Sequence, residues 1–349
     1  MAGGAASRAW WSVAVLLTAL AGSRAHAGQS GADTREYRYL MGTSVQVQAA
    51  GGDEAARRAA IGEAFAAMVE VDRLMSNYRS DSELAHVNRE AAHSPVVVSD
   101  PMLRVLEAAQ RISADSNGAF DVTVGPLVRL WGFRDKTPHI PTPAELAEVR
   151  PFVGYRGLTI DDERHTVRFA HAGMEIDLGG IAKGFAVELA ACVLRAHRLH
   201  GFIDAGGNQY MVGTPPGKPA WTIGIRNPDS ADRLMGVIDV AGGSVSTSAN
   251  DANVLVSAGR TYGHLRDPRT LQPSTTSLSA TIVSDDGTLA DGMSKAAFIL
   301  GPKDGIALID SYPGMSGVIA YRQPDGGVGV AASRHVRFHP IVSPRKATR

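Results

Sequence analysis

The chain contains a single cysteine, Cys192, among its 349 residues. One cysteine excludes an intramolecular disulfide, and it excludes the zinc sites built from four cysteines or from cysteines with histidines. The fold must therefore be held together by packing. Hydrophobic residues make up 44% of the chain and charged residues 20%, which supports a sizeable core and excludes disorder as the main state. The 35 basic residues balance 35 acidic ones, so no basic excess is available to neutralise nucleic-acid phosphates.

The first 27 residues have the pattern of a secretory signal peptide. Arg8 supplies a positive charge, residues 10–21 are apolar, and Ala25-His26-Ala27 gives a small-x-small cleavage pattern. The apolar run is too short to span a bilayer comfortably. No cysteine follows it to carry a lipid anchor. We therefore expect a signal peptide over residues 1–27, one domain over residues 28–349, and a periplasmic location.

Hydrophobic spacing and capping residues predict helices and strands in mixed order along the mature chain. In the first half we expect a strand over 37–49, a helix over 53–79, a helix from Ser99 to a stop at Asn117-Gly118, and a capping-box helix at Thr142. A strand over 166–176 and a helix running to about residue 200, with Gly201 past its end, follow. The second half is predicted to contain mostly strands over 202–283, a helix over 288–300 stopped by Gly301-Pro302, and a final hairpin turning at 324–327. Strands in runs favour a single α+β unit.

The most informative stretch lies between Asp177 and Gly184, where a predicted strand gives way to a helix. Gly179 and Gly180 would allow backbone N–H groups to approach a ligand, and the start of a helix favours a phosphate. Lys183 falls in the first helical turn, where a cation is better tolerated beside an anion. The spacing matches neither a Walker A loop nor a dinucleotide-binding glycine motif. A tight turn without a ligand remains the alternative reading.

Three further clusters carry residues with chemical potential. Asp121 lies between apolar residues, and a buried carboxylate needs partners. His264 precedes a turn and is a candidate acid/base, although a lone histidine is more often a surface residue. Asp291 and Lys295 are four residues apart at a predicted helix start, where a surface ion pair is the simplest explanation.

Short motifs recur through the whole mature chain in a fixed order. They are Met41-Gly42-Thr43, Asp72-x-x-Met75-Ser76-x-Tyr78, Asp81-Ser82-Glu83-Leu84-x-x-x-Asn88, Gly118-x-Phe120-Asp121-Val122-Thr123-Val124-Gly125-Pro126-Leu127, Trp131-Gly132-Phe133, Asp177-Leu178-Gly179-Gly180-Ile181-Ala182-Lys183-Gly184, Ala205-Gly206-Gly207-Asn208, Ser246-Thr247-Ser248, His264-x-x-Asp267-Pro268-Arg269-Thr270 and Ala290-Asp291. This series strongly resembles the bacterial FAD:protein FMN transferases, the ApbE-like flavin transferases. The resemblance implies a single α+β unit related to the T-fold.

The resemblance also implies an activity: with Mg²⁺, FAD is cleaved, FMN is attached to a threonine of an acceptor flavoprotein, and AMP is released. The implied FAD-binding positions are Met41, Tyr78, Ala119, Phe120, Asp121, Asp177 and Lys183, and we assign Arg266 to the same site. The implied metal ligands are Asp291, Ser294 and the carbonyl of Gly180. His264 resembles the acid/base that receives the threonine proton.

Several positions depart from the family pattern. Lys295 stands where a threonine usually helps to bind Mg²⁺, and residues 249–253 replace a glycine and aromatic-arginine pattern. Arg266 replaces an apolar residue, and Leu271 replaces a glycine. These departures concern the metal and the acceptor side more than FAD binding. Two alternatives therefore stay open: a periplasmic FAD-binding accessory protein with weak or lost transfer activity, and an FAD pyrophosphatase that uses water as acceptor.

Overall fold

The computed structural model describes residues 33–132, 137, 139–215, 217–250, 254–257 and 260–341. The expected signal peptide over 1–27 and Phe133 of the tryptophan motif lie outside these residues. Within them the fold is a mixture of helices and antiparallel sheets, as the α+β expectation required. No helix in the described ranges is both long and apolar enough to cross a bilayer.

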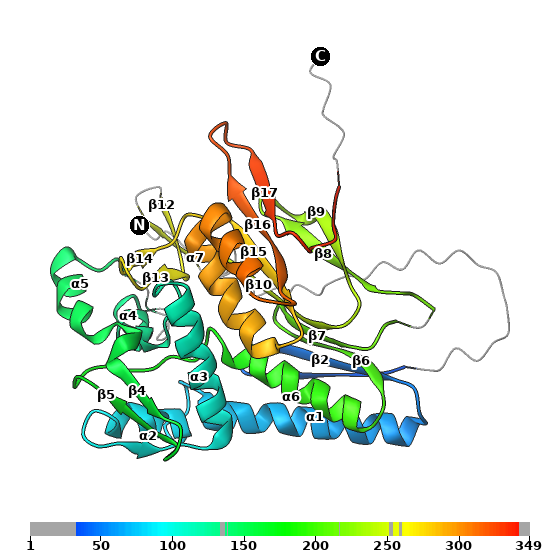
Figure 1. Cartoon of the computed structure of the whole chain (residues 1–349), viewed down its shortest axis with the longest axis horizontal. Helices are drawn as coiled ribbons and strands as arrows, with labels where there is room; N and C mark the ends of the chain where they lie inside the picture. Colours follow the sequence, from blue (N-terminus) through cyan, green and yellow to red (C-terminus); the bar gives the residue numbers. More distant parts are fainter. Residues whose placement is uncertain are drawn as a thin grey trace, which may run out of the picture.

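One eight-stranded antiparallel sheet forms the centre of the molecule (Figure 1). Its strands follow the order β1-β2-β6-β7-β10-β15-β16-β17, with β1 at Thr34–Leu40, β2 at Thr43–Ala50, β6 at His200–Ala205, β7 at Asn208–Val212, β10 at Gly243–Ala249, β15 at Ser279–Ser284, β16 at Ser316–Arg322 and β17 at Val328–Ala332. In this order β2 pairs with β6, so segments about 150 residues apart in the chain are neighbours.

The two faces of this sheet are covered differently. Helices α1 (Glu54–Met75), α6 (Ala182–Ala196) and α7 (Gly287–Ser311) pack on one face and share the main hydrophobic core with it. A three-stranded sheet of β8 (Trp221–Asn227), β9 (Ser230–Val240) and β18 (Phe338–Pro340) packs on the other. Successive side chains of each strand point to opposite faces of the sheet, so each strand contributes to both layers of the core. In β6, for example, Phe202 faces Trp221 with ring centroids 5.8 Å apart, whereas Ile203 faces the helices.

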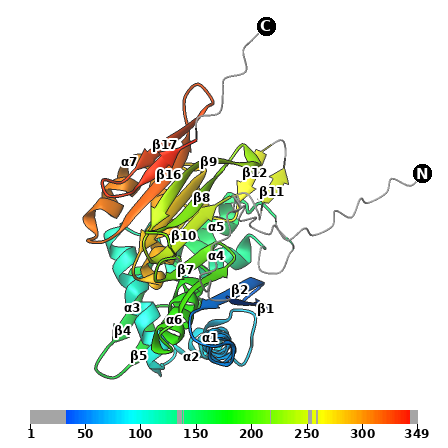
Figure 2. The same cartoon turned by 90° about the vertical axis from the view of Figure 1, so that its right-hand side faces the viewer.

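Two smaller groups of elements flank the sheet. The first contains α2 (Glu83–Glu90), α3 (Asp100–Asp115) and a small sheet of β3 (Val96–Val97), β5 (Thr166–Phe169) and β4 (Leu158–Asp161). The second contains α4 (Gly125–Leu130), α5 (Pro143–Val149), and two hairpins, β11 (Val254–Ser257) with β12 (Arg260–Gly263) and β13 (Arg266–Asp267) with β14 (Gln272–Pro273). Figure 2 shows the β11–β12 hairpin on the same side as α4 and α5. The short 3₁₀ helices are η1 (Val122–Val124), η2 (Arg150–Phe152) and η3 (Tyr155–Gly157).

Local capping signals located several helices correctly. Asp53, Ser99 and Thr142 each accept a hydrogen bond from a first-turn amide of α1, α3 and α5, and Thr142 forms a complete capping box with Glu145. The run of strands over 202–283 and the final hairpin between β16 and β17 are also confirmed. The helix α2 was not predicted.

Five expected elements are wrong in detail. The helix expected over 53–79 ends at Met75. Residues 37–49 form a hairpin rather than one strand, because Met41 and Gly42 both take positive φ in the turn between β1 and β2. The strand over 166–176 ends at Phe169. Gly201 lies inside β6 rather than capping α6. The helix predicted to stop at Gly301-Pro302 resumes beyond a kink at Gly301, where φ is 84° and ψ is −175°.

Candidate functional site

The turn that leads into α6 is held by long-range contacts rather than by a strand. The backbone N–H of Ile176 donates to the side-chain oxygen of Asn88 at 2.7 Å, and the Asn88 amide returns a bond to the Ile176 carbonyl at 2.9 Å. The amide of Asp177 donates to the Val122 carbonyl at 2.7 Å. One asparagine side chain and one loop thus replace the sheet partner that this segment lacks, and they present Asp177 at the start of the turn.

Within the turn, several backbone donors already have partners. The amide of Gly179 donates to Asp177 Oδ1 at 2.8 Å, and the amide of Gly184 donates to Asp291 Oδ2 at 2.8 Å. Lys183 lies in the first turn of α6, as expected, and its ammonium donates to the Gly179 carbonyl at 3.3 Å. The turn therefore offers a diphosphate a cation and the positive end of the helix more than a row of unused amides.

Two helices touch through their backbones beside this turn. A Cβ atom added at Gly184 would lie 2.0 Å from the Gly287 carbonyl oxygen and 2.5 Å from Asp291 Cβ. The crossing of α6 and α7 therefore requires glycine at residue 184. The same crossing places the amide of Gly184 against the Asp291 carboxylate.

Phe120 joins a third segment to this crossing. Its ring would contact Cβ atoms added at Gly180, at 3.4 Å, and at Gly292, at 3.5 Å. Phe120 and Ala119 are both buried. The structure therefore brings together the segments around residues 120, 180 and 291, which are far apart in the sequence.

Asp291 is fully buried at the centre of a set of hydroxyl groups. Ser246 Oγ lies 3.5 Å from Asp291 Oδ1 and 3.3 Å from Ser294 Oγ, and Ser248 Oγ lies 2.8 Å from Ser294 Oγ. Lys295 forms an ion pair with Asp291 Oδ1, and its Nζ lies 3.3 Å from Ser294 Oγ. Burial lowers the pKa of Lys295, and the charge of Asp291 opposes that shift.

A divalent cation does not fit this arrangement as it stands. Carboxylate and hydroxyl oxygens are suitable Mg²⁺ ligands, but an ammonium group cannot be one. Here the ammonium of Lys295 contacts both expected side-chain ligands, Asp291 and Ser294. In the described part of the chain, no group of three or more His, Cys, Asp or Glu residues could hold a metal ion. We therefore derive no step of the reaction through Mg²⁺.

Asp121 has a well-defined structural role. Its Oδ1 accepts bonds from the amide and the hydroxyl of Thr123, both at 2.7 Å, and its Oδ2 accepts a bond from the Tyr155 amide at 2.6 Å. Burial raises the pKa of the Asp121 carboxyl, and these hydrogen bonds oppose the shift. The buried carboxylate has the partners that its position demands. It fixes η1 and the loop around Tyr155 beside Phe120.

His264 lies between β12 and β13 in the second flanking group. Its backbone carbonyl accepts a bond from Arg266 Nη1 at 2.6 Å, and the Arg266 guanidinium lies 4.8 Å from the Trp131 ring centroid. Burial lowers the pKa of Arg266 to about 9. Arg266 therefore contacts the loop that carries His264, and its assignment to the FAD site stays a prediction.

Asn250 connects the His264 loop to the hydroxyl set. It follows β10, the strand that carries Ser246 and Ser248. Its Oδ1 accepts a bond from the Leu265 amide at 3.1 Å, and its Nδ2 donates to the Ser274 carbonyl at 3.2 Å. The remaining residues of the unusual segment, 251–253, lie outside the described part of the chain.

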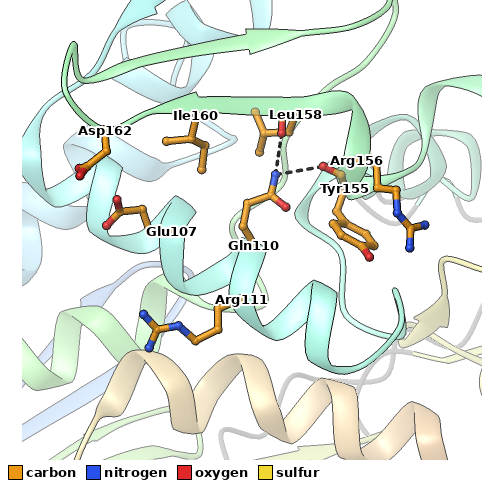
Figure 3. Close-up of a pocket in the computed structure, with 8 residues that line it drawn as sticks. All are labelled: Glu107, Gln110, Arg111, Tyr155, Arg156, Leu158, Ile160 and Asp162. Carbon is orange, nitrogen blue, oxygen red and sulfur yellow. Dashed lines mark hydrogen bonds between the residues drawn. The ribbon is translucent and has the colours of Figure 1, made fainter.

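A separate cavity of about 490 Å³ lies between α3 and β4 (Figure 3). Gln110 closes its base by donating from Nε2 to the carbonyls of Leu158, at 2.7 Å, and Tyr155, at 3.0 Å. Burial and the neighbouring Asp162 raise the pKa of Glu107 in its wall. None of the residues expected to bind FAD lines this cavity, so it is not the candidate site.

Known proteins resemble this chain over most of its length. The sequence model of the ApbE family matches residues 41–319. The chain belongs to the ApbE family. A protein from Treponema pallidum named FAD:protein FMN transferase is 32% identical, with 93% of this chain and 94% of the relative covered. A protein of the same name from Klebsiella pneumoniae is 27% identical over 89% of this chain and 96% of the relative.

Solved structures of ApbE proteins share the fold. The ApbE protein from Thermotoga maritima gives a TM-score of 0.78 at 28% identity, with 86% of this chain and 97% of that chain covered. The flavin transferase ApbE from Vibrio cholerae gives a TM-score of 0.77 at 28% identity, with 87% and 98% covered. The expected family and fold class are therefore confirmed.

Eight of the twelve positions we expected to form a site are adjacent; His264 and Arg266 belong to the hairpin group described above, and Met41 and Tyr78 lie elsewhere. Ala119, Phe120, Asp121, Asp177, Gly180, Lys183, Asp291 and Ser294 surround the α6–α7 crossing. Tyr78, 79% exposed, lies in the loop between α1 and α2, and Met41 lies in the turn between β1 and β2. Within the described chain, no hydrogen bond, ion pair or ring contact links either side chain to the crossing. Their assignment to FAD stays a prediction.

Sequence reasoning missed the structural partners of the site. Ser246 and Ser248 were noted only as part of a motif, and Asn208, whose Oδ1 accepts a bond from Ser246 at 2.7 Å, was noted in the same way. Alternation would have placed Ser246 and Ser248 on one face of a strand. No local signal indicated that this face meets α7.

Proposed function

We propose that this protein is an FAD:protein FMN transferase. It cleaves the diphosphate of FAD and attaches FMN to a threonine of an acceptor flavoprotein, with release of AMP. The observation that carries the proposal is the convergence of Lys183, Phe120 and the Asp291 hydroxyl set at one helix crossing, in a chain whose relatives bear this name.

In the proposed reaction, the acceptor threonine oxygen attacks the phosphorus of the FMN half of FAD. A new P–O bond forms to threonine, the P–O bond to the AMP phosphate breaks, and AMP leaves with the electron pair. The hydroxyl proton passes to His264, because a threonine hydroxyl is a poor nucleophile until a base takes its proton. Lys183 neutralises charge on the diphosphate beside the positive end of α6.

Aromatic and polar side chains fix the orientation of the bound FAD in this proposal. Phe120 and the exposed Tyr78 offer ring surfaces to the FAD ring systems. Met41 adds apolar contact at the hairpin turn. Asp121 acts through the loop that it holds, and Asp177 acts through the turn that it caps at Gly179.

The test is incubation of the purified mature protein with FAD and an acceptor fragment that carries the threonine, followed by mass spectrometry. We expect the acceptor to gain the mass of FMN less one water, with an equal amount of AMP. Free FMN and AMP without an acceptor adduct would instead identify an FAD pyrophosphatase. FAD binding without either product would identify an accessory protein.

We also propose that this protein acts in the periplasm and meets its acceptor there. The support for this location is the signal-peptide pattern over residues 1–27 of the sequence. Expression of the full chain in a bacterium, with mass analysis of the periplasmic fraction, tests it. We expect a mature protein that begins at residue 28, and a cytoplasmic, uncleaved product would contradict this location.

A further inference from the structure

The Asp291 site already contains a positive charge of its own. The Asp291 carboxylate is fully buried, and the Lys295 side chain that pairs with it is only 15% exposed. A buried carboxylate strongly requires a compensating charge. Lys295 supplies that charge from the next turn of the same helix, α7, so no ion from solution is needed to stabilise Asp291.

The ammonium of Lys295 also occupies the position that a metal would need. Mg²⁺ binds oxygen ligands at about 2.0–2.1 Å in near-octahedral geometry. Asp291 Oδ1 is in contact with Lys295 Nζ, and Asp291 Oδ2 accepts the Gly184 amide at 2.8 Å. A metal could reach Oδ1 only if the ammonium left it, and a displaced ammonium nearby would still repel the metal.

A second ammonium lies close to the first. Lys183, in the first turn of α6, is near enough to Lys295 for the two positive charges to repel each other. Two cations at the meeting point of α6 and α7, with one carboxylate between the helices, leave one net positive charge. A divalent ion on Asp291, with Lys183 still beside it, would leave two net positive charges, so the two ammonium groups attract a diphosphate in the same sense but with half the net charge.

We propose that the Lys295 ammonium takes the place of a divalent cation at Asp291, and that Lys295 and Lys183 together attract the FAD diphosphate without a metal. The proposal rests on the proposed function for the identity of the diphosphate ligand. It assigns Lys295 as a binding residue that stays protonated and transfers no proton. FAD binding and FMN transfer by this chain therefore do not require Mg²⁺.

The decisive measurements use the natural protein first. Isothermal titration with MgCl₂ alone should show no binding at millimolar metal, and the Kd for FAD should change less than about twofold between EDTA and 5 mM Mg²⁺ (about 0.4 kcal/mol). FMN transfer should likewise proceed in EDTA. A natural protein that binds Mg²⁺ tightly, or that needs Mg²⁺ to bind FAD, would overturn the proposal.

The substitution Lys295→Thr sharpens this test by restoring a hydroxyl and removing the charge. In EDTA it leaves Asp291 facing the diphosphate, so FAD binding should weaken by about tenfold, and Mg²⁺ should restore it. Lys303→Thr, the same change at an exposed position of α7, should leave FAD binding metal-independent. If Lys295→Thr binds FAD equally well in EDTA and in Mg²⁺, Lys295 does not replace a cation.

Failure of the proposed function gives a different result. FAD binding and its metal dependence are measured without any acceptor, so they report on Lys295 even if no FMN is transferred. Absence of transfer by both the natural protein and Lys295→Thr, in EDTA and in Mg²⁺, would reject the transferase while leaving the binding result in place.

Discussion

The two sides of the candidate site are built on different principles. At the α6–α7 crossing, backbone meets backbone, and the approach of Gly184 to Gly287 leaves no room for a methyl group. On the hairpin side, around His264, large side chains fill the space: the rings of Trp131 and Tyr262 lie 6.1 Å apart and tilted by 41°. Backbone contact fixes a geometry rigidly, whereas side-chain packing can be rearranged by substitution.

The departures from the ApbE family pattern follow this division. Arg266, Leu271 and the unusual segment that begins at residue 249 all belong to the hairpin side. At the crossing, Lys295 is the departure we identified, and it changes charge without changing the backbone. In the proposed function, the crossing binds the diphosphate of FAD, which every reaction shares. The hairpin side faces the acceptor protein, which can differ from one enzyme to the next.

The largest expected effect is on the rate of FMN transfer, and it comes from a substitution on the hairpin side that leaves FAD affinity unchanged. His264→Ala should lower FMN transfer by about 10²–10⁴-fold, because a general base is lost, while the Kd for FAD stays unchanged. Steady-state transfer rates and FAD titration measure the two quantities. His335→Ala, at an exposed position, serves as the control. Equal losses of rate and affinity would show that His264 is structural.

The next effect tests the rigidity of the crossing. Gly184→Ala should lower the free energy of unfolding by about 3 kcal/mol and weaken FAD binding, because the added Cβ forces the helices apart. Urea denaturation measures the change. Gly62→Ala is the matched control: it lies in α1 with no neighbouring atom within 4 Å and should stabilise the protein by about 0.5–1 kcal/mol. A fully stable Gly184→Ala would contradict the comparison.

A smaller effect examines how the hairpin side tolerates strain. Leu271 takes φ of 62°, a conformation that favours glycine, and its buried side chain packs with Leu127 and Trp131. Leu271→Gly and Leu271→Ala should both be destabilising, because packing is lost. The glycine variant should be the more stable of the two by about 1 kcal/mol, since only alanine keeps the strain. The reverse order, measured by thermal unfolding, would refute this account.

The smallest effect concerns the pH dependence contributed by Asp121. Its pKa is raised in the folded protein from 3.8, so the folded state holds the proton more tightly than the unfolded state. Its contribution to stability is therefore complete below about pH 3.8 and is lost as pH rises through the folded-state pKa. Asp121→Asn should lack this decline, so the stability of the natural protein relative to the variant, measured by urea denaturation across a pH series, should fall as pH rises. A difference that instead grows in favour of the natural protein with rising pH would contradict it.

The sequence predicted those parts of the fold that depend on neighbouring residues. Ser99 and Thr142 cap their helices through bonds to amides only three residues away, and Asp291 meets Lys295 within one helical turn. It failed where distant segments decide. Ile176 lies outside any strand, and the side chain of Asn88, 88 residues earlier in the chain, satisfies its backbone; the motif contained Asn88 but not this contact. Gly201 looked like a helix cap, but a Cβ there would lie 2.3 Å from the Gln48 carbonyl in β2.

The candidate site shows the same limit. The motifs identified Lys183, Phe120 and Asp291 as residues of interest, and the structure places them together. The contact of Ser246 and Ser248 with Ser294 depends on how β10 lies against α7, which no local pattern encodes. Asn250 could be recognised as unusual in sequence, but its bonds to the segment after His264 could not.

The pairing of β2 with β6 also determines the order in which the molecule can form. Residues 45–50 emerge early during synthesis, but their partners at residues 200–205 follow about 150 residues later. Until then the hairpin of β1 and β2 has an open edge, and α1 lacks its neighbour α6. Closing so long a loop makes folding slow, because chain entropy is lost before the contacts form. The nascent chain thus carries an unpaired edge at β2, open to aggregation, until β6 has been made.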